Sequence, residues 1–256
     1  AVRIFTDSAC DLEFSELEAL QVELLRIPVF FDEERYIEGE NLTREEFYEK
    51  LAVSERLPKT AQITPVEFEE AFRPYVEAGE EIVVLPLAKE LSGYDEIYIV
   101  DSQQALCGLR MLVDFACVLR DEGLSAREIA EQVESASHRV RLFGIVNTLE
   151  YLHKGGRLPA SMAVVGTLLK VKPLITLREG EVGILGKGLG VKNGLDNLLK
   201  LMGDEIHPEP RLPLYFGYTQ THNLCDQLRE RVVEKYHPAR VEQNSVGAVV
   251  GTHVGP

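Results

Sequence analysis

The chain has 256 residues, of which 45% are hydrophobic and 27% charged, a composition typical of a folded globular protein with one large or two modest domains. Its formal net charge is −15, and this acidity, without a basic block, argues against binding to nucleic acid or to an anionic membrane surface. No apolar run approaches the roughly 20 residues of a membrane-spanning helix, and no signal peptide is visible. The four cysteines form no C-x-x-C pair, so we expect a reducing, cytoplasmic setting without disulfides or structural zinc.

Strands and helices alternate through the first part of the chain. A short buried strand covers residues 2–5, and a helix then leads to a second strand that ends near Phe31. Thr43 stands three residues before Glu46, which is the spacing of a capping box and predicts the start of a helix. Further helices are expected from about Gly108 to Arg120 and from Ser125 to about His138, followed by a strand at residues 141–147.

Two of the expected strands end in the same pair of residues. Asp7 and Ser8 follow the first strand, and Asp101 and Ser102 follow a later one. Ligands of open α/β sheets bind at the carboxyl ends of the strands, so these pairs indicate the edge where a ligand is expected.

The connection between the apolar strands at residues 80–87 and 95–102 is too short for a parallel arrangement. A parallel crossover needs about a dozen residues or more and usually contains a helix. We therefore expect either that the two strands pair antiparallel or that a helix is absent from the chain between Gly93 and Tyr94.

The pattern changes after residue 155. Residues 171–188 read as a hairpin with Glu179 and Gly180 as its turn, and residues 212–220 and 245–256 read as strands separated by a helix at about 223–236.

The chain as a whole is therefore expected to be an α/β protein of two domains. Residues 1–155 are predicted to form a parallel-sheet α/β/α domain, and residues 156–256 a smaller mixed-sheet α/β domain.

Two short polar strings could present hydroxyl groups to a ligand. Thr60 lies in the string Lys-Thr-Ala-Gln that ends at Gln62, where it could bond its own backbone in a turn or point toward a ligand. Ser92 precedes Gly93, and this pair could cap a helix or approach an anion closely; the two interpretations are compatible.

Two glycine-rich strings carry a basic side chain. Arg157 follows Gly155 and Gly156, where it could be a solvated residue of a tight turn or be held toward an anion. His253 lies in a glycine-rich loop expected after an apolar strand, where a structural role and a ligand role are equally plausible. The other histidines form no metal-binding spacing, and the glycine run at 186–190 lacks the βαβ context of a dinucleotide loop.

Taken in order, these strings resemble the DegV family, which includes the fatty-acid-binding subunits of the bacterial fatty acid kinase. The resemblance covers nearly the whole chain. It runs through FTDSACDL, KTAQITP, LSG, IVDS, NTLEYLHKGGRL, LLKVKPLITLREG and VVGTHVGP.

The resemblance implies a cytoplasmic bacterial lipid carrier rather than an enzyme. Its two domains would enclose one long-chain fatty acid, such as palmitate, stearate or oleate, in an apolar tunnel, with no cofactor and no metal. The hydroxyls of Thr60 and Ser92 would hold the carboxylate with His253 close by, and Gly93, Gln62 and Arg157 would be secondary contacts. A separate kinase subunit would phosphorylate the carboxylate, with no stable membrane insertion of the carrier.

Three departures from the family pattern affect these expectations. The LSG string usually continues with Thr-Tyr and a helix, whereas Tyr94 follows here directly. An arginine is common near Leu189, and its absence bears on docking to a kinase. Ala61 stands where serine is common, so one polar contact is lost.

Two other functions stay open from the sequence. The Gly-Gly-Arg loop suggests a phosphate-handling enzyme related to dihydroxyacetone kinase, which ATP turnover by the chain alone would support. A regulatory interaction protein would carry no extractable lipid.

Overall fold

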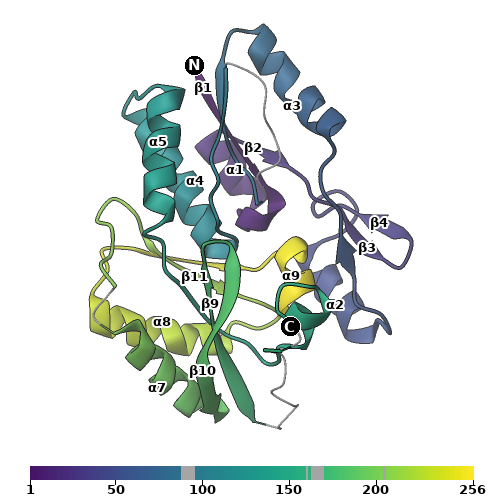
Figure 1. The fold of residues 1–256 in the computed structure, drawn as a ribbon, viewed down its shortest axis with the longest axis vertical. Helices are drawn as coiled ribbons and strands as arrows, with labels where there is room; N and C mark the ends of the chain where they lie inside the picture. The colour runs from purple at the N-terminus through teal and green to yellow at the C-terminus, as the bar shows by residue number, and fades with distance from the viewer. Residues whose placement is uncertain (88–95, 160, 163–169, 204–205) are drawn as a thin grey trace.

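The computed structural model describes residues 1–87, 96–159, 161–162, 170–203 and 206–256 (Figure 1). Its first part is built on a sheet of four parallel strands in the order β2-β1-β6-β7. The bounds of these strands are Val2–Asp7 for β1, Val22–Leu25 for β2, Glu81–Leu85 for β6 and Ile97–Ile99 for β7.

Helices cover both faces of this sheet because neighbouring residues of its central strands point to opposite sides. Ile4 packs in the cluster that contains α4 (Leu106–Asp121), whereas Phe5 packs against Phe72 of α3 (Pro65–Glu77). The helix α5 (Ala126–Ser137) lies beside α4, as Figure 1 shows. This three-layer arrangement confirms the predicted α/β/α architecture.

Strands β6 and β7 are parallel, with Ile82 opposite Ile97. The antiparallel alternative drawn from the short connection is therefore wrong. Residues 88–95, which contain the Gly93–Tyr94 junction, lie outside the described residues.

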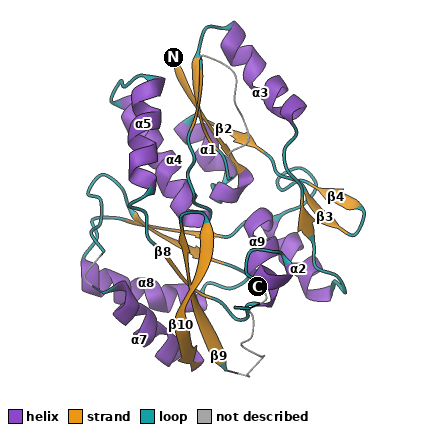
Figure 2. Ribbon diagram, in the orientation of Figure 1, coloured by secondary structure: helices purple, strands orange, loops and turns teal. Residues whose placement is uncertain are grey.

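The second part contains two smaller sheets (Figure 2). The order β10-β9-β8 is antiparallel throughout, and β11 pairs in parallel with β12. The bounds are Leu142–Ile145 for β8, Val171–Arg178 for β9, Glu181–Leu189 for β10, Leu214–Tyr218 for β11 and Val241–Ser245 for β12. The helix α7 (Gly190–Met202) packs on the first of these sheets, and α8 (Asn223–Tyr236) packs on β11.

The predicted hairpin is confirmed, because β9 and β10 pair around Glu179 and Gly180, both of which have positive φ angles. Strand β8 precedes the predicted domain boundary and yet pairs with β9. This antiparallel sheet therefore takes β8 from before residue 155 and β9 and β10 from after it, and the division at that residue stays a prediction.

The remaining elements are short. They are η1 (Ser8–Cys10), α1 (Phe14–Leu20), β3 (Val29–Phe31), β4 (Glu34–Tyr36), α2 (Arg44–Val53), β5 (Lys59–Thr60), α6 (Glu150–Lys154) and α9 (Ala248–Val254). The capping box at Thr43 is confirmed, since its hydroxyl accepts from the Glu46 N–H at the start of α2. None of the helices within the described ranges has the length and apolar character needed to cross a bilayer.

The prediction of a strand over residues 245–256 is wrong, because only Ser245 belongs to β12 and residues 248–254 form α9. His253 consequently lies in the last turn of a helix and not in a loop. The N–H groups of Gly247 and Ala248 are bonded by side chains distant in the sequence, which favours a helix start that the local valine-rich pattern does not indicate.

Candidate functional site

The structure brings Thr60 and His253 into contact although 193 positions separate them in the sequence. The distance between Thr60 Oγ1 and His253 Nε2 is 3.2 Å, and both side chains are partly buried. Thr60 is placed by β5, which pairs with Val29 of β3, and the Ala61 N–H bonds the Pro28 carbonyl. His253 is placed by α9, which packs against β3 and β5.

The environment of His253 keeps its ring neutral. Burial, with a smaller contribution from the charge of Arg157, lowers the pKa of the ring from 6.5 to about 4. At neutral pH the ring is therefore a hydrogen-bonding group and not a cation that pairs with a carboxylate.

The contacts of the ring also indicate where its proton lies. His253 Nδ1 is buried and has no hydrogen-bond partner among the described residues. A proton on Nε2 has an acceptor in Thr60 Oγ1, whereas a proton on the buried Nδ1 would have no acceptor in the part of the chain that the structure describes. We therefore assign the proton to Nε2, which leaves the Thr60 hydroxyl hydrogen free to donate to a ligand.

The string with Arg157 lies beside this pair. Gly155 follows α6, and a Cβ atom added to it would stand 2.7 Å from His253 Nδ1. The Arg157 side chain is exposed, and its Nη1 donates to the Gly155 carbonyl at 2.6 Å. Arg157 thus lies close enough to influence His253 while its guanidinium faces solvent.

The remaining predicted site residues are Gln62, Ser92 and Gly93. Gln62 is exposed. Ser92 and Gly93 lie outside the described residues. The pair at the end of the first strand has a structural role, since Asp7 accepts from the Ala9 N–H and Ser8 from the Ile27 N–H.

A cavity of about 470 Å³ lies between the two sheets of the second part. It is lined by residues 140–147 around β8 and by residues 214–221 around β11, and these two strands do not pair with each other. Residues of α4, α7 and α8 complete the wall, including Leu106, Met111, Val191, Leu224 and Leu228. Its volume falls within the 300–1,000 Å³ typical of small-molecule sites, and its lining is mainly apolar.

The cavity reaches the residues that follow His253 at the end of α9. Val254, Gly255 and Pro256 contribute to its wall, directly after His253. Thr60 and His253 do not themselves line it. An apolar chain in this cavity would therefore have the Thr60–His253 pair close to one part of the wall, which residues 254–256 form.

Sequence reasoning missed the residues of the cavity wall. The half-buried apolar side chains of β8 and β11 give the same pattern as strands that pack in a core. No local signal separates the two cases, because the cavity depends on how two sheets meet.

Within the described ranges, no three histidine, cysteine or acidic side chains are grouped so that they could hold a metal ion. The glycine run at 186–190 lies at the end of an antiparallel strand, and not after a parallel strand as in a dinucleotide loop.

The fold and the site define an α/β protein with an apolar cavity beside a threonine–histidine pair. The family model described as "Uncharacterised protein, DegV family" matches residues 1–256, and the chain belongs to the DegV family. A DegV domain-containing protein of Clostridium perfringens is 30% identical over 272 aligned residues, which cover 98% of this chain and 93% of the relative.

Solved structures share the whole fold. A structure described as fatty acid binding of a DegV family protein from Thermus thermophilus is 29% identical, with a TM-score of 0.88, and the match covers 100% of this chain and 96% of that chain. A fatty acid binding DegV family protein from Streptococcus agalactiae is 27% identical, with a TM-score of 0.84, and the match covers 100% and 95% of the two chains.

Proposed function

We propose that this chain binds one long-chain fatty acid in the cavity between β8 and β11 and holds its carboxylate at Thr60. The cavity is the observation that carries the proposal, because it is apolar and reaches the residues that follow His253. The fatty-acid-binding relatives from Thermus thermophilus and Streptococcus agalactiae support this choice of ligand.

The affinity would come from the alkyl chain. About fifteen methylene groups leaving water contribute on the order of 12 kcal/mol, at roughly 0.8 kcal/mol for each. Loss of the ligand's translational and conformational freedom opposes binding by several kcal/mol or more. The remainder allows tight binding without an ion pair to the carboxylate.

The polar groups would therefore orient the ligand. A neutral His253 donates to Thr60, and the Thr60 hydroxyl then donates to a carboxylate oxygen, with Ser92 as the second donor. Neutral donors leave most of the negative charge on the carboxylate, which suits a group that has to attack a phosphoryl donor. We propose that a separate kinase subunit in the cytoplasm supplies that donor, and that Arg157, with its exposed guanidinium, contributes to docking or to charge neutralisation.

Filling the cavity tests the proposal. Leu228 on α8 lines the cavity, so Leu228→Trp places a large ring in the space assigned to the alkyl chain. Leu201→Trp is the matched control, because Leu201 is 44% exposed and does not line the cavity. Displacement of a fluorescent fatty acid should show that Leu228→Trp binds the lipid at least tenfold more weakly, a loss of roughly 1.4 kcal/mol or more. The affinity of Leu201→Trp should change little.

Two outcomes would count against the proposal. Equal affinities of the two variants, with both folded, would place the lipid elsewhere. ATP turnover by the purified chain alone would favour the enzymatic alternative.

A further inference from the structure

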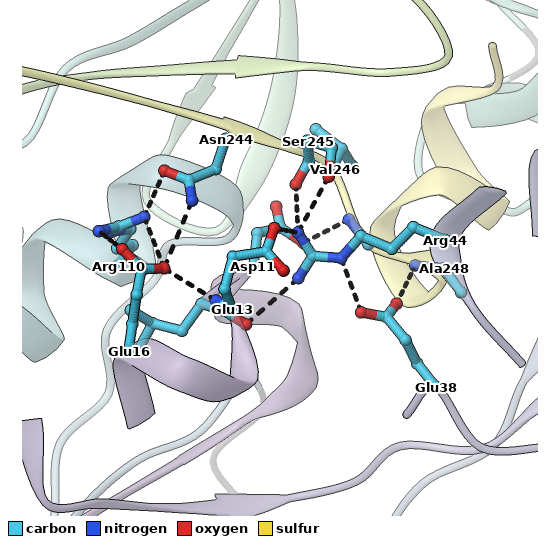
Figure 3. Close-up of polar contacts among 12 residues, drawn as sticks. Asp11, Glu13, Glu16, Glu38, Arg44, Arg110, Asn244, Ser245, Val246 and Ala248 are labelled. Atoms are coloured by element: carbon cyan, nitrogen blue, oxygen red, sulfur yellow. Dashed lines mark hydrogen bonds and ion pairs between the residues drawn. The ribbon is translucent and has the colours of Figure 1, made fainter. Parts of the chain in front are cut away.

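The segment that joins β12 to α9 is held by side chains from the first fifth of the chain (Figure 3). Four consecutive residues each have one backbone group bonded in this way. The Ser245 carbonyl accepts from Arg44 at 2.7 Å, the Val246 carbonyl from Tyr48 at 3.0 Å, and the N–H groups of Gly247 and Ala248 donate to Asp11 at 2.8 Å and Glu38 at 2.6 Å.

Arg44 is the centre of this network, and only 9% of its side chain is exposed. Its Nε donates to Glu38 Oε1 at 2.8 Å, and its Nη1 donates to Glu13 Oε1 at 2.6 Å. Its Nη2 donates to the Leu12 carbonyl at 3.2 Å. The planar guanidinium therefore fixes Glu38 relative to two backbone segments, through the Leu12 carbonyl and the Ser245 carbonyl.

The fit around Gly247 is close. A Cβ atom at this position would stand 2.8 Å from Glu38 Oε2 and 3.1 Å from Asp11 Oδ1. The two carboxyl groups thus reach the start of α9 because residue 247 has no side chain. They also take two of the N–H groups that the start of a helix leaves free.

The position of α9 at its start determines the position of His253 at its end. The helix has seven residues, too few to be stable by itself, so its placement depends on tertiary contacts. Gly247 and His253 are six positions apart, which corresponds to about 9 Å of helix at roughly 1.5 Å per residue. A small rotation at Gly247 would consequently change the 3.2 Å contact between His253 and Thr60.

We propose that Arg44, Glu38 and Asp11 are positioning residues of the head-group site, which set the distance between His253 and Thr60. The inference rests on the proposed function, because it concerns the site that would hold the carboxylate. None of the three residues contacts that site directly. They act through α9.

Two variants and one control test the proposal. Arg44→Lys keeps the charge but loses the planar fork, and Glu38→Gln removes the charge that Arg44 and Ala248 share. The control is Arg120→Lys, since Arg120 is also largely buried, with 14% of its side chain exposed, and its Nη1 donates to the Leu20 carbonyl at 2.9 Å, away from α9.

The measurements separate positioning from simple stabilisation. All three variants should lower the thermal midpoint. Only Arg44→Lys and Glu38→Gln should raise the pKa of His253, by about one unit or more toward its usual value, in an NMR titration of lipid-free protein. Both should also move the carboxyl resonance of bound palmitate labelled with ¹³C at C1, while palmitate affinity falls by less than about tenfold.

The proposal is overturned if both variants lose stability but keep the wild-type His253 titration and carboxyl resonance. Should Arg44→Lys fail to fold, Glu38→Gln gives the decision. A wild-type protein that takes up no palmitate contradicts the proposed function, and the His253 titration in lipid-free protein then still decides whether these residues position α9.

Discussion

Replacing Gly155 by alanine should disturb the head-group site without touching the cavity. Gly155 has φ of −78°, which alanine adopts freely, so the effect is steric. The new Cβ would stand 2.7 Å from His253 Nδ1 and 2.9 Å from the Tyr151 carbonyl. Ordinary contacts begin at 3.4 Å, so the imidazole has to move away from the new Cβ atom. The 3.2 Å distance between His253 Nε2 and Thr60 Oγ1 then changes.

The magnitude follows from the cost of overpacking. Forcing one extra methyl group into a well-packed position costs about 1–3 kcal/mol. For a chain of this length each kcal/mol lowers Tm by roughly 2–4 °C, so Gly155→Ala should lower Tm by several degrees. The assay is thermal unfolding together with the NMR resonances of the His253 ring, which should shift. Palmitate affinity should fall by less than about tenfold, because the alkyl chain supplies most of it.

Gly194→Ala is the matched control for this prediction. Gly194 lies inside α7, and the nearest atom to an added Cβ is Lys172 Cβ at the ordinary distance of 3.5 Å. Alanine in a helix is favoured over glycine by about 0.5–1 kcal/mol, so this variant should be as stable as the wild type or more stable. If Gly155→Ala behaves like the control and leaves the His253 resonances unchanged, the close packing of the site is refuted.

Three further predictions concern charge and head-group contacts. Because burial lowers the pKa of His253 to about 4, its neutral ring contributes stability that is complete above its unfolded pKa of about 6.5 and is lost as the pH falls through 4. An NMR titration of the ring with a midpoint near 6.5 would contradict this. Replacing both Thr60 and Ser92 by alanine should shift the ¹³C resonance of the bound carboxyl and keep palmitate affinity within about tenfold, so complete loss of binding would contradict the assignment of affinity to the alkyl chain. Burial raises the pKa of Asp11 to about 7, so its contribution to stability is complete below its unfolded value of about 4 and is lost as the pH rises through 7. In urea unfolding, Asp11→Asn should therefore lose less free energy of unfolding at pH 8 than at pH 5.5, and equal losses at the two pH values would refute the prediction.

Elements that depend on local sequence were predicted correctly. The capping box at Thr43 and the hairpin turn at Glu179 and Gly180 require only residues that are neighbours in the chain. The helix expected at about residues 223–236 is confirmed as α8 for the same reason.

Features that depend on distant residues were not predictable in the same way. The start of α9 is bonded by Asp11, 236 positions before Gly247, so the valine- and glycine-rich segment resembled a strand. The contact between Thr60 and His253 was expected from the family resemblance and not from any spacing. The cavity between β8 and β11 arises where two sheets fail to pair, which no single strand reveals.

Mass spectrometry of lipid extracted from the purified wild-type protein tests the central claim most directly. The cavity of about 470 Å³ predicts close to one long-chain fatty acid for each chain, bound without a covalent link. A protein that yields no fatty acid, and that takes up none when palmitate, stearate or oleate is added, would contradict the claim.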